Sequence, residues 1–216
     1  MELNKYIDHT YLKPIGTEVD IEKLCQEALN YDFASVCVQP CYVKKAKALL
    51  KKSNVAIGTV IGFPLGANTI ETKVYEIKQA LKNGADEVDA VINIGALKAK
   101  NYEYLEKEVE ELVKAASDHI LKIIIEISYL DDIEIIKMCE ICRNKFVNFI
   151  KTSTGFSESG ATIEAVKLMK AHAGDLLEVK ASGGIRTYED TIKYIEAGAS
   201  RIGTSSGVKI MEESAK

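Results

Sequence analysis

Short apolar runs that fit β-strands alternate with amphipathic helical segments along the whole of this 216-residue chain. Regular alternation of strand and helix predicts a parallel sheet with helical crossovers. Eight such units in a chain of this length predict a compact (β/α)8 barrel that forms a single domain over residues 1–216. An open, doubly wound sheet is the alternative fold. The eight strand-like runs are expected at residues 6–12, 33–38, 55–63, 87–94, 121–128, 146–152, 176–180 and 200–203.

The helical segments carry start signals of their own. Thr17 has Asp20 three residues later, and Thr187 has Asp190 at the same distance, which is the spacing of a capping box. The approaches to two strands, at residues 83–86 and 197–200, both combine a glycine with small residues. This recurrence is typical of a repeated βα unit.

The two faces of the predicted strands differ in polarity. Period-two alternation places isoleucine and valine on one face. Both faces of an open sheet would be apolar under helices, whereas a barrel tolerates charge near its mouth, at the C-terminal ends of the strands. The pattern therefore favours the barrel and predicts a site at that mouth. The charged residues on the second face are Asp89, Lys122, Glu126, Lys151, Glu178, Lys180 and Arg201.

Composition argues against several classes of function. The formal net charge is −4 and no basic block is present, so a nucleic-acid partner is not expected. No apolar run is long enough to span a membrane. The first residues show no signal-peptide pattern, so a cytoplasmic protein is expected.

Cysteines and histidines do not indicate a disulfide framework or a metal site. The cysteine count of five is odd, which argues against disulfide pairing. Cys139 and Cys142 form a C-x-x-C pair inside a helical pattern, with no second pair and no histidine cluster. They are interpreted as small core residues.

Two lysines, Lys151 and Lys180, each end an apolar strand, and Lys151 shares its face with Val147 and Phe149. Apolar surroundings disfavour the charged form and lower the pKa of a lysine, and a neutral amine can attack a carbonyl carbon. Two ammonium groups about 5 Å apart repel by roughly 3 kcal/mol at an effective dielectric of about 20. That lowers the pKa of one lysine by roughly two units. The alternative is that both lysines pair with carboxylates and stay charged.

Glycine-rich turns follow the last two predicted strands. Gly183 and Gly184 follow the seventh strand, and the run 203–207 follows the eighth, with Arg186 and Ser205 nearby. These are the usual positions of the phosphate site in (β/α)8 barrels. Glycines there let backbone N–H groups approach the anion. Two tight structural turns are the alternative interpretation.

Seven segments resemble the deoxyribose-phosphate aldolase family in order and spacing, and the likeness covers nearly the whole chain. The resemblance implies a class I aldolase that reversibly cleaves 2-deoxy-D-ribose 5-phosphate to D-glyceraldehyde 3-phosphate and acetaldehyde, in deoxyribonucleotide catabolism. The segments are KTSTGF at 151–156, VKASGGIRT at 179–187, EVDAVINIG at 87–95, IDHTYLKP at 7–14, ASVCVQP at 34–40, VIGFPLG at 60–66 and RIGTSSG at 201–207.

Carried over by motif, the resemblance implies roles for individual residues. Lys151 would be the Schiff-base nucleophile, Lys180 the second lysine that depresses its pKa, and Asp89 the acid in proton transfer. No metal and no organic cofactor are implied. Family members often associate, so a homodimer or a higher homo-oligomer is expected. The expected phosphate-binding residues are Gly155, Gly183, Gly184, Arg186, Gly203, Ser205 and Ser206.

Some positions depart from the family pattern or keep an open role. Phe156 stands where some members have a phosphate-binding lysine, and the chain ends in MEESAK, without the terminal tyrosine of some members. Cys37 matches a cysteine near the family's site, although a core role fits its strand position equally well. Two rival functions are left open: a phosphosugar isomerase or epimerase with Asp89 or Glu126 as base, and a non-catalytic phosphate-binding protein.

Overall fold

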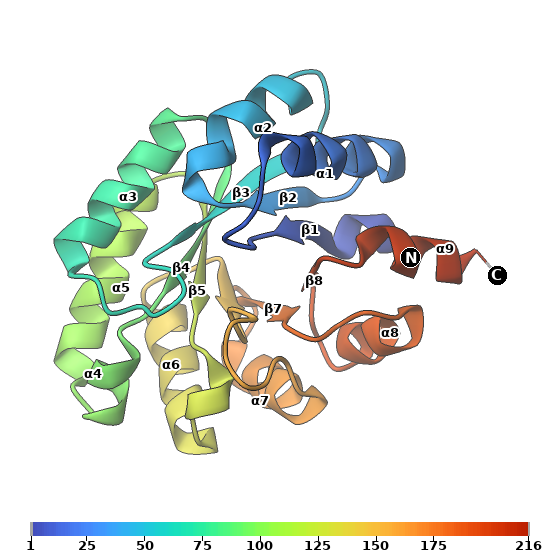
Figure 1. The fold of residues 1–216 in the computed structure, drawn as a ribbon. Helices are drawn as coiled ribbons and strands as arrows, with labels where there is room; N and C mark the ends of the chain where they lie inside the picture. Colours follow the sequence, from blue (N-terminus) through green and yellow to red (C-terminus); the bar gives the residue numbers. More distant parts are fainter. Residues whose placement is uncertain (1, 216) are drawn as a thin grey trace.

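The strand runs pair side by side into a closed barrel, as a computed structural model that describes residues 2–215 shows (Figure 1). Each strand is parallel to both of its neighbours, and β8 pairs with β1 to close the cylinder. The (β/α)8 barrel is confirmed, and the open sheet is wrong. The strands are β1 (Ile7–Tyr11), β2 (Ser35–Val38), β3 (Ala56–Ile61), β4 (Glu87–Val91), β5 (Ile120–Ile124), β6 (Phe149–Lys151), β7 (Glu178–Ser182) and β8 (Arg201–Thr204).

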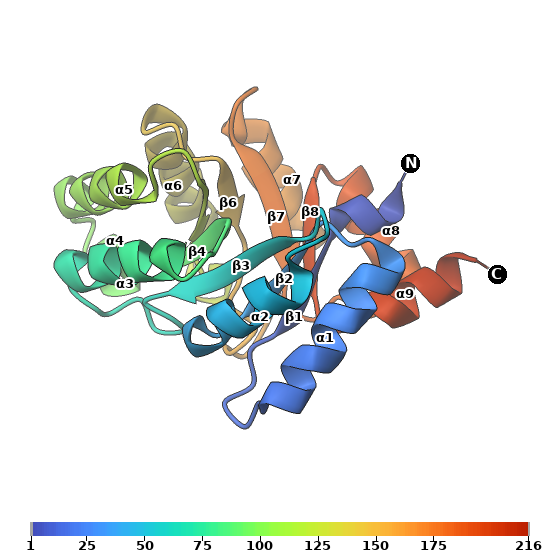
Figure 2. The same cartoon turned by 90° about the horizontal axis from the view of Figure 1, so that it is seen from above.

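Helices surround the strands on all sides (Figures 1 and 2). The two expected starts are confirmed. Thr17 and Asp20 form a capping box, and the Thr187 hydroxyl oxygen accepts the Asp190 N–H at 3.2 Å. The helices are α1 (Glu18–Tyr31), α2 (Val43–Leu50), α3 (Ile70–Lys82), α4 (Ile94–Lys98), α5 (Tyr102–Ala116), α6 (Asp132–Asn144), α7 (Ile163–Ala173), α8 (Tyr188–Glu196) and α9 (Gly207–Ser214), with 3₁₀ turns at Leu3–Tyr6, Pro40–Tyr42 and Ile127–Tyr129.

Several strands are shorter than the apolar runs that predicted them. Phe146 has a left-handed backbone with φ of 58°, and the N–H of Val147 donates to Cys142 at the end of α6. Strand β6 therefore begins only at Phe149. Glu126 has φ of 54°, which turns the chain away from the sheet just after β5. Alternation of residue types does not reveal these left-handed positions.

Two helices were not predicted from the sequence. α4 begins where a strand was expected to continue, because the Asn93 side chain accepts the Ala96 N–H at 3.0 Å and caps a short helix. α9 follows the last strand in a segment for which no element was predicted, and it is anchored by the buried residues Gly207 and Ile210.

The apolar core lies between the strands and the helices. Ile123, Ile150, Val179 and Ile202 point outward from four adjacent strands and are 0 % exposed. Each buried aliphatic side chain of this kind contributes roughly 1.5–3 kcal/mol through loss of contact with water. Because neighbouring residues on a strand face opposite sides, the same packing turns the intervening polar residues into the barrel.

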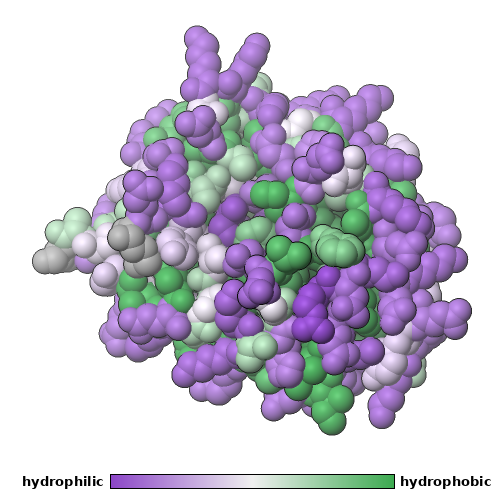
Figure 3. Space-filling model, turned by 180° about the vertical axis from the view of Figure 1, so that it is seen from behind, coloured by the Kyte–Doolittle hydropathy of each residue, from purple (hydrophilic) through white to green (hydrophobic). Residues whose placement is uncertain are grey.

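On the face turned away from the viewer in Figure 1, hydrophilic residues predominate and smaller hydrophobic patches lie between them (Figure 3). Within residues 2–215, no helix is both long and apolar enough to cross a membrane.

Candidate active site

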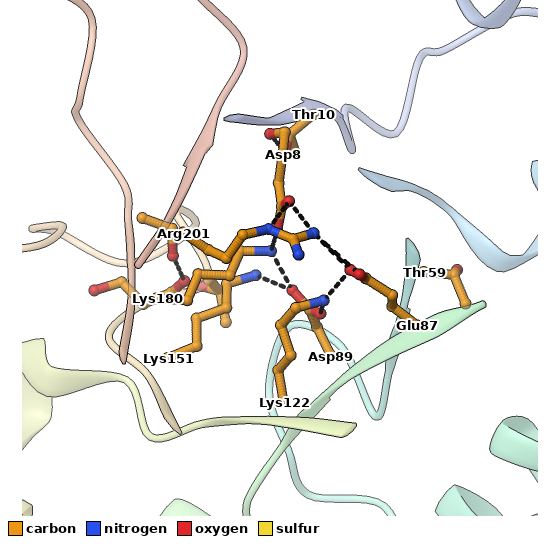
Figure 4. A network of polar contacts seen from close by, with 12 residues as sticks. Asp8, Thr10, Thr59, Glu87, Asp89, Lys122, Lys151, Lys180 and Arg201 are labelled. Carbon is orange, nitrogen blue, oxygen red and sulfur yellow. Dashed lines mark hydrogen bonds and ion pairs between the residues drawn. The ribbon is translucent and has the colours of Figure 1, made fainter. Parts of the chain in front are cut away.

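Seven charged side chains from six strands point into the barrel and meet there (Figure 4). Six of them are at most 3 % exposed, and the Arg201 side chain is 12 % exposed. Charged groups at this depth are stable only when they are paired and hydrogen-bonded. The seven are Asp8 on β1, Glu87 and Asp89 on β4, Lys122 on β5, Lys151 on β6, Lys180 on β7 and Arg201 on β8.

Asp89 is the centre of this cluster. Its Oδ2 accepts hydrogen bonds from Lys151 and Lys180, each at 2.8 Å, and its Oδ1 accepts one from Lys122 at 3.0 Å. Lys151 and Lys180 are register partners on adjacent strands. The three residues that the sequence analysis singled out as catalytic therefore contact one another. The prediction that apolar groups surround Lys151 is wrong, because the carboxylate of Asp89 contacts its amine.

Asp8 is a site residue that the sequence argument missed. Its carboxylate pairs with Lys180 at 2.5 Å and accepts hydrogen bonds from Arg201 Nε and Ser35 Oγ, both at 2.7 Å. Asp8 is an acidic residue within the first expected strand run, 6–12, so a signal for it was present in the sequence. Asp8 holds the side of Lys180 that faces away from Asp89.

The pKa values of the two buried lysines shift in opposite directions. It lowers the pKa of Lys151, an effect that Asp89 opposes and Lys180 strengthens. Burial alone would lower the pKa of Lys180 as well, but Asp8 and Asp89 outweigh it and raise that pKa above its ordinary value. Asp89, although buried, has a pKa well below the usual carboxyl range because Lys122, Lys151 and Lys180 surround it. Lys151 is therefore the lysine whose neutral amine is more readily formed.

A cleft of about 380 Å³ opens above Lys151. Its walls include Gly155, Gly183 and Gly184, whose φ values of 84°, 91° and 85° lie in the left-handed region that favours glycine. A Cβ on Gly184 would meet no atom within 4 Å, so this backbone faces open space. Of the seven expected phosphate-binding residues, the cleft is lined by Gly155, Gly183, Gly184, Arg186, Gly203 and Ser205.

Ser206 is the exception. It lines a neighbouring cavity of about 420 Å³ between α1 and α9, which shares Thr10, Tyr11 and Ser205 with the cleft. Its N–H donates to the Thr204 hydroxyl oxygen at 2.9 Å, which fixes the turn after β8.

Side-chain hydrogen bonds connect the loops that line the cleft. Ser182 Oγ donates to the Ser153 carbonyl at 2.6 Å, and Thr152 Oγ1 donates to the Ser182 carbonyl at 3.1 Å. Thr204 Oγ1 donates to the Ile185 carbonyl at 2.7 Å. These bonds join the turns after β6, β7 and β8, so the glycine backbone is held in place before any ligand arrives.

A family model described as DeoC/LacD family aldolase matches residues 3–213 of the chain. This chain belongs to the DeoC/LacD aldolase family. It is 55% identical to the deoxyribose-phosphate aldolase of Caldanaerobacter subterraneus subsp. tengcongensis, over 99% of this chain and 94% of that one. It is 54% identical to that of Mycoplasma capricolum subsp. capricolum, over 98% of this chain and 95% of that one. The family expected from the sequence motifs is confirmed.

The fold agrees with solved members of the same family. A deoxyribose phosphate aldolase from Aeropyrum pernix, described as having a unique tetrameric structure, superposes with a TM-score of 0.92. It is 36% identical in sequence, and the match covers 99% of this chain and 91% of that one.

Phe156 and Cys37 lie on the apolar side of the DeoC/LacD site. The Phe156 ring meets the Phe63 ring edge-on, with centroids 5.2 Å apart, and half of Phe156 is exposed to the cleft. Phe63 packs in turn against a small buried cluster of Leu12, Cys37 and Val60. Burial raises the pKa of the Cys37 thiol to about 11, so this cysteine is a neutral, buried residue of that cluster.

Other residues singled out in the sequence lie outside the cluster. Glu126 follows β5, and its carboxylate accepts hydrogen bonds from the N–H and Oγ1 of Thr154. Glu178, expected on the inner face, is half-buried at the start of β7. Cys139 and Cys142 are free thiols buried in α6. Within residues 2–215, no group of three or more histidine, cysteine or acidic side chains is arranged to hold a metal ion.

Proposed function

We propose that this chain is a class I aldolase that reversibly cleaves 2-deoxy-D-ribose 5-phosphate to D-glyceraldehyde 3-phosphate and acetaldehyde through a Schiff base on Lys151. One observation carries the assignment: Lys151 and Lys180 share one oxygen of Asp89 at the floor of a glycine-lined cleft. The proposal extends to this chain the activity named for relatives that are 54–55% identical over nearly its full length.

In the proposed reaction, the neutral amine of Lys151 attacks C1 of the open-chain sugar, and loss of water gives a protonated imine. Removal of the C3 hydroxyl proton then breaks the C2–C3 bond, whose electron pair passes into the imine and forms an enamine. Glyceraldehyde 3-phosphate leaves. Protonation of the enamine at C2 and hydrolysis of the imine release acetaldehyde and restore Lys151. The imine serves as the electron sink, so the steps need neither a metal nor an organic cofactor.

Asp89 and Lys180 have complementary roles in this scheme. Asp89 Oδ2 is within 2.8 Å of both amines, which fits a group that receives and returns protons during imine formation. Lys180 is held between Asp8 and Asp89 and stays protonated, because both carboxylates raise its pKa. A permanent positive charge beside Lys151 favours the neutral form of the nucleophile.

The glycine turns and Arg186 form the proposed phosphate end of the cleft. Gly155, Gly184 and Ser205 are exposed on its lining and can bring backbone N–H groups to the anion. Arg186 is exposed at the same rim and supplies positive charge. Ser206 follows Ser205 in the same turn and is retained as a proposed phosphate-binding residue. Phe156 follows Gly155 on the same lining and adds an apolar ring, packed against Phe63, where some relatives have a phosphate-binding lysine.

The proposal extends to assembly and compartment. A relative from Aeropyrum pernix is described as a tetramer, and homo-oligomers with closed symmetry are common among soluble proteins. We therefore expect a homodimer or a higher homo-oligomer. All five cysteines are free thiols, which is usual for proteins of the reducing cytoplasm. We therefore propose that the enzyme acts in deoxyribonucleotide catabolism in the cytoplasm.

The deciding experiment is chemical trapping. The protein is incubated with acetaldehyde or deoxyribose 5-phosphate and then with borohydride, and the modified lysine is located by peptide mass spectrometry. The expected adduct is on Lys151. Lys151→Met should lose both the adduct and sugar cleavage, whereas Lys13→Met, which removes an exposed lysine from the same cleft, should keep both.

The rival functions give different results. An adduct on Lys180 would transfer the nucleophile role to that residue. Turnover of a phosphosugar without any trapped lysine would overturn the aldolase proposal and favour an isomerase or epimerase. A phosphate-binding protein would show neither an adduct nor turnover.

A further inference from the structure

Six ion-paired side chains inside the barrel form a closed ring (Figure 4). Lys180 bridges Asp89 and Asp8. Arg201 bridges Asp8 and Glu87, with contacts of 2.5 and 2.9 Å. Lys122 bridges Glu87 and Asp89, at 2.5 and 3.0 Å, which closes the ring.

Charges alternate perfectly around this ring. Each of the three carboxylates contacts two ring cations, and each of the three cations contacts two ring carboxylates. The ring is therefore neutral when all six groups are ionised. Lys151 is a fourth cation attached from outside, through the single oxygen of Asp89 that Lys180 already uses.

The surroundings offer Lys151 little further compensation. Cys37 on β2 is neutral at ordinary pH, since burial raises its pKa to about 11. Glu126, beyond β5, directs its carboxylate to Thr154 and is not a member of the ring. The Phe149 ring lies 5.8 Å from both Lys122 and Arg201, so the far side of the ring rests on an apolar group. A surplus charge is costly in such a setting, because a buried ion without its own partner is poorly solvated.

We infer that Glu87, Lys122 and Arg201 are positioning residues that complete a neutral ring and so leave Lys151 as the surplus cation that releases its proton. None of the three lines the cleft, and Lys151 does. They act on the nucleophile through Asp89 and Asp8. This inference rests on the proposed aldolase function, in which Lys151 must be a neutral amine to react.

The ring predicts opposite effects for opposite charges. Lys122→Met removes a ring cation, so the ring becomes negative and protonated Lys151 restores neutrality. The titration midpoint of Lys151 should therefore rise by about one pH unit. Glu87→Gln removes a ring carboxylate, so the midpoint should fall by a similar amount. The double variant is neutral again and should titrate close to the wild type.

The measurement is the rate at which 1-fluoro-2,4-dinitrobenzene labels Lys151, followed by peptide mapping over a pH series. Labelling requires the neutral amine but no catalysis. A matched control neutralises another fully buried pair, Lys73 and Glu108, whose charged atoms are 2.6 Å apart. Lys73→Met with Glu108→Gln should lower stability without moving the Lys151 midpoint.

The sign of the shift in any folded variant decides the inference. Arg201→Gln provides a second cation removal and should act like Lys122→Met. Equal midpoints in all folded variants, or shifts of the same sign for Lys122→Met and Glu87→Gln, would overturn it. Borohydride trapping with the wild type separates this result from the proposed function. A trapped Lys151 with unmoved midpoints refutes the ring inference alone, and absence of trapping refutes the aldolase reaction.

Discussion

The amines of Lys151 and Lys180 both donate to Oδ2 of Asp89, each at 2.8 Å. Two ammonium groups on one oxygen compete for the same negative charge, and their mutual repulsion makes the doubly protonated state unfavourable. Lys180 has a second carboxylate partner, Asp8, whereas Lys151 has no second carboxylate partner in the cluster besides Asp89. The asymmetry of these partners, rather than any difference in burial, decides which lysine gives up its proton.

Removing the charge of Lys180 should shift the pH profile of the reaction. In Lys180→Met, one fewer cation competes with Lys151 for the carboxylate of Asp89, and the repulsion between the two ammonium groups disappears. The pKa of Lys151 should therefore rise. A rise of about one to two units leaves roughly ten to a hundred times less neutral amine at neutral pH. The acid limb of kcat/KM should move to higher pH, with activity partly recovered there. Lys180→Arg keeps the charge and should keep the limb near its wild-type position. An unshifted limb in Lys180→Met would give Lys180 another role.

Stability in acid should depend on the two central aspartates. Burial alone would raise their pKa values, but the neighbouring cations hold the pKa of Asp8 and of Asp89 well below the usual range. A depressed carboxyl pKa contributes stability that is complete above the unfolded value of about 4 and is lost as pH falls below it. The free energy of unfolding should fall by about 1.4 kcal/mol per pH unit for each carboxylate.

Urea unfolding at a series of acidic pH values measures this slope. Asp8→Asn is less stable at neutral pH because Lys180 and Arg201 lose a partner, but its free energy of unfolding should fall less steeply in acid. Identical slopes for the variant and the wild type would contradict the assignment of acid sensitivity to this aspartate.

A methyl group on Gly184 should interfere with the phosphorylated substrate. Gly184 lines the cleft, a Cβ at this position meets no atom within 4 Å, and φ of 85° is strained for alanine. Gly184→Ala should raise KM for deoxyribose 5-phosphate about tenfold, equivalent to about 1.4 kcal/mol. The reaction of unphosphorylated deoxyribose should change much less.

The control for Gly184→Ala is Gly174→Ala. Gly174 follows α7 and also has a positive φ, of 70°, but a Cβ there approaches the flexible Arg143 side chain, and Gly174 does not line the cleft. If Gly184→Ala weakened both substrates equally, or if Gly174→Ala reproduced the effect, strain and not phosphate contact would explain the loss.

The strand pattern was sufficient to place the central residues of the site. Period-two alternation predicted that Asp89, Lys151 and Lys180 face the interior of the barrel. In a parallel barrel the C-terminal ends of all strands lie at the same mouth. The ring could not be derived in this way. Alternation says that a side chain faces the interior but not at which height, so the bond between Arg201 and Asp8, 193 residues apart, depends on strand register.

Local backbone conformation accounts for the remaining differences. Ser206 lies directly before α9, a helix that was not predicted, and it lines the cavity between α1 and α9, which Ser205 lines as well. Glu126 was expected to share a strand face with Lys122, but its left-handed φ ends the strand before it. Neither change leaves a signal in residue type, since serine and glutamate are common in both strands and loops.

Glu126→Gln distinguishes the aldolase from an isomerase that would use Glu126 as its base. The Glu126 carboxylate accepts the N–H and the hydroxyl of Thr154, which lines the cleft next to Gly155. Glutamine keeps one acceptor oxygen, so the loop should loosen and KM should rise several-fold, while Lys151 and Asp89 remain untouched. Trapping of acetaldehyde on Lys151 should persist with a kcat close to that of the wild type. A catalytic base typically contributes about 10²–10⁴-fold to rate. A loss of kcat of that size in Glu126→Gln, with Thr154→Val unaffected, would place the chemistry on Glu126 and not on the lysines.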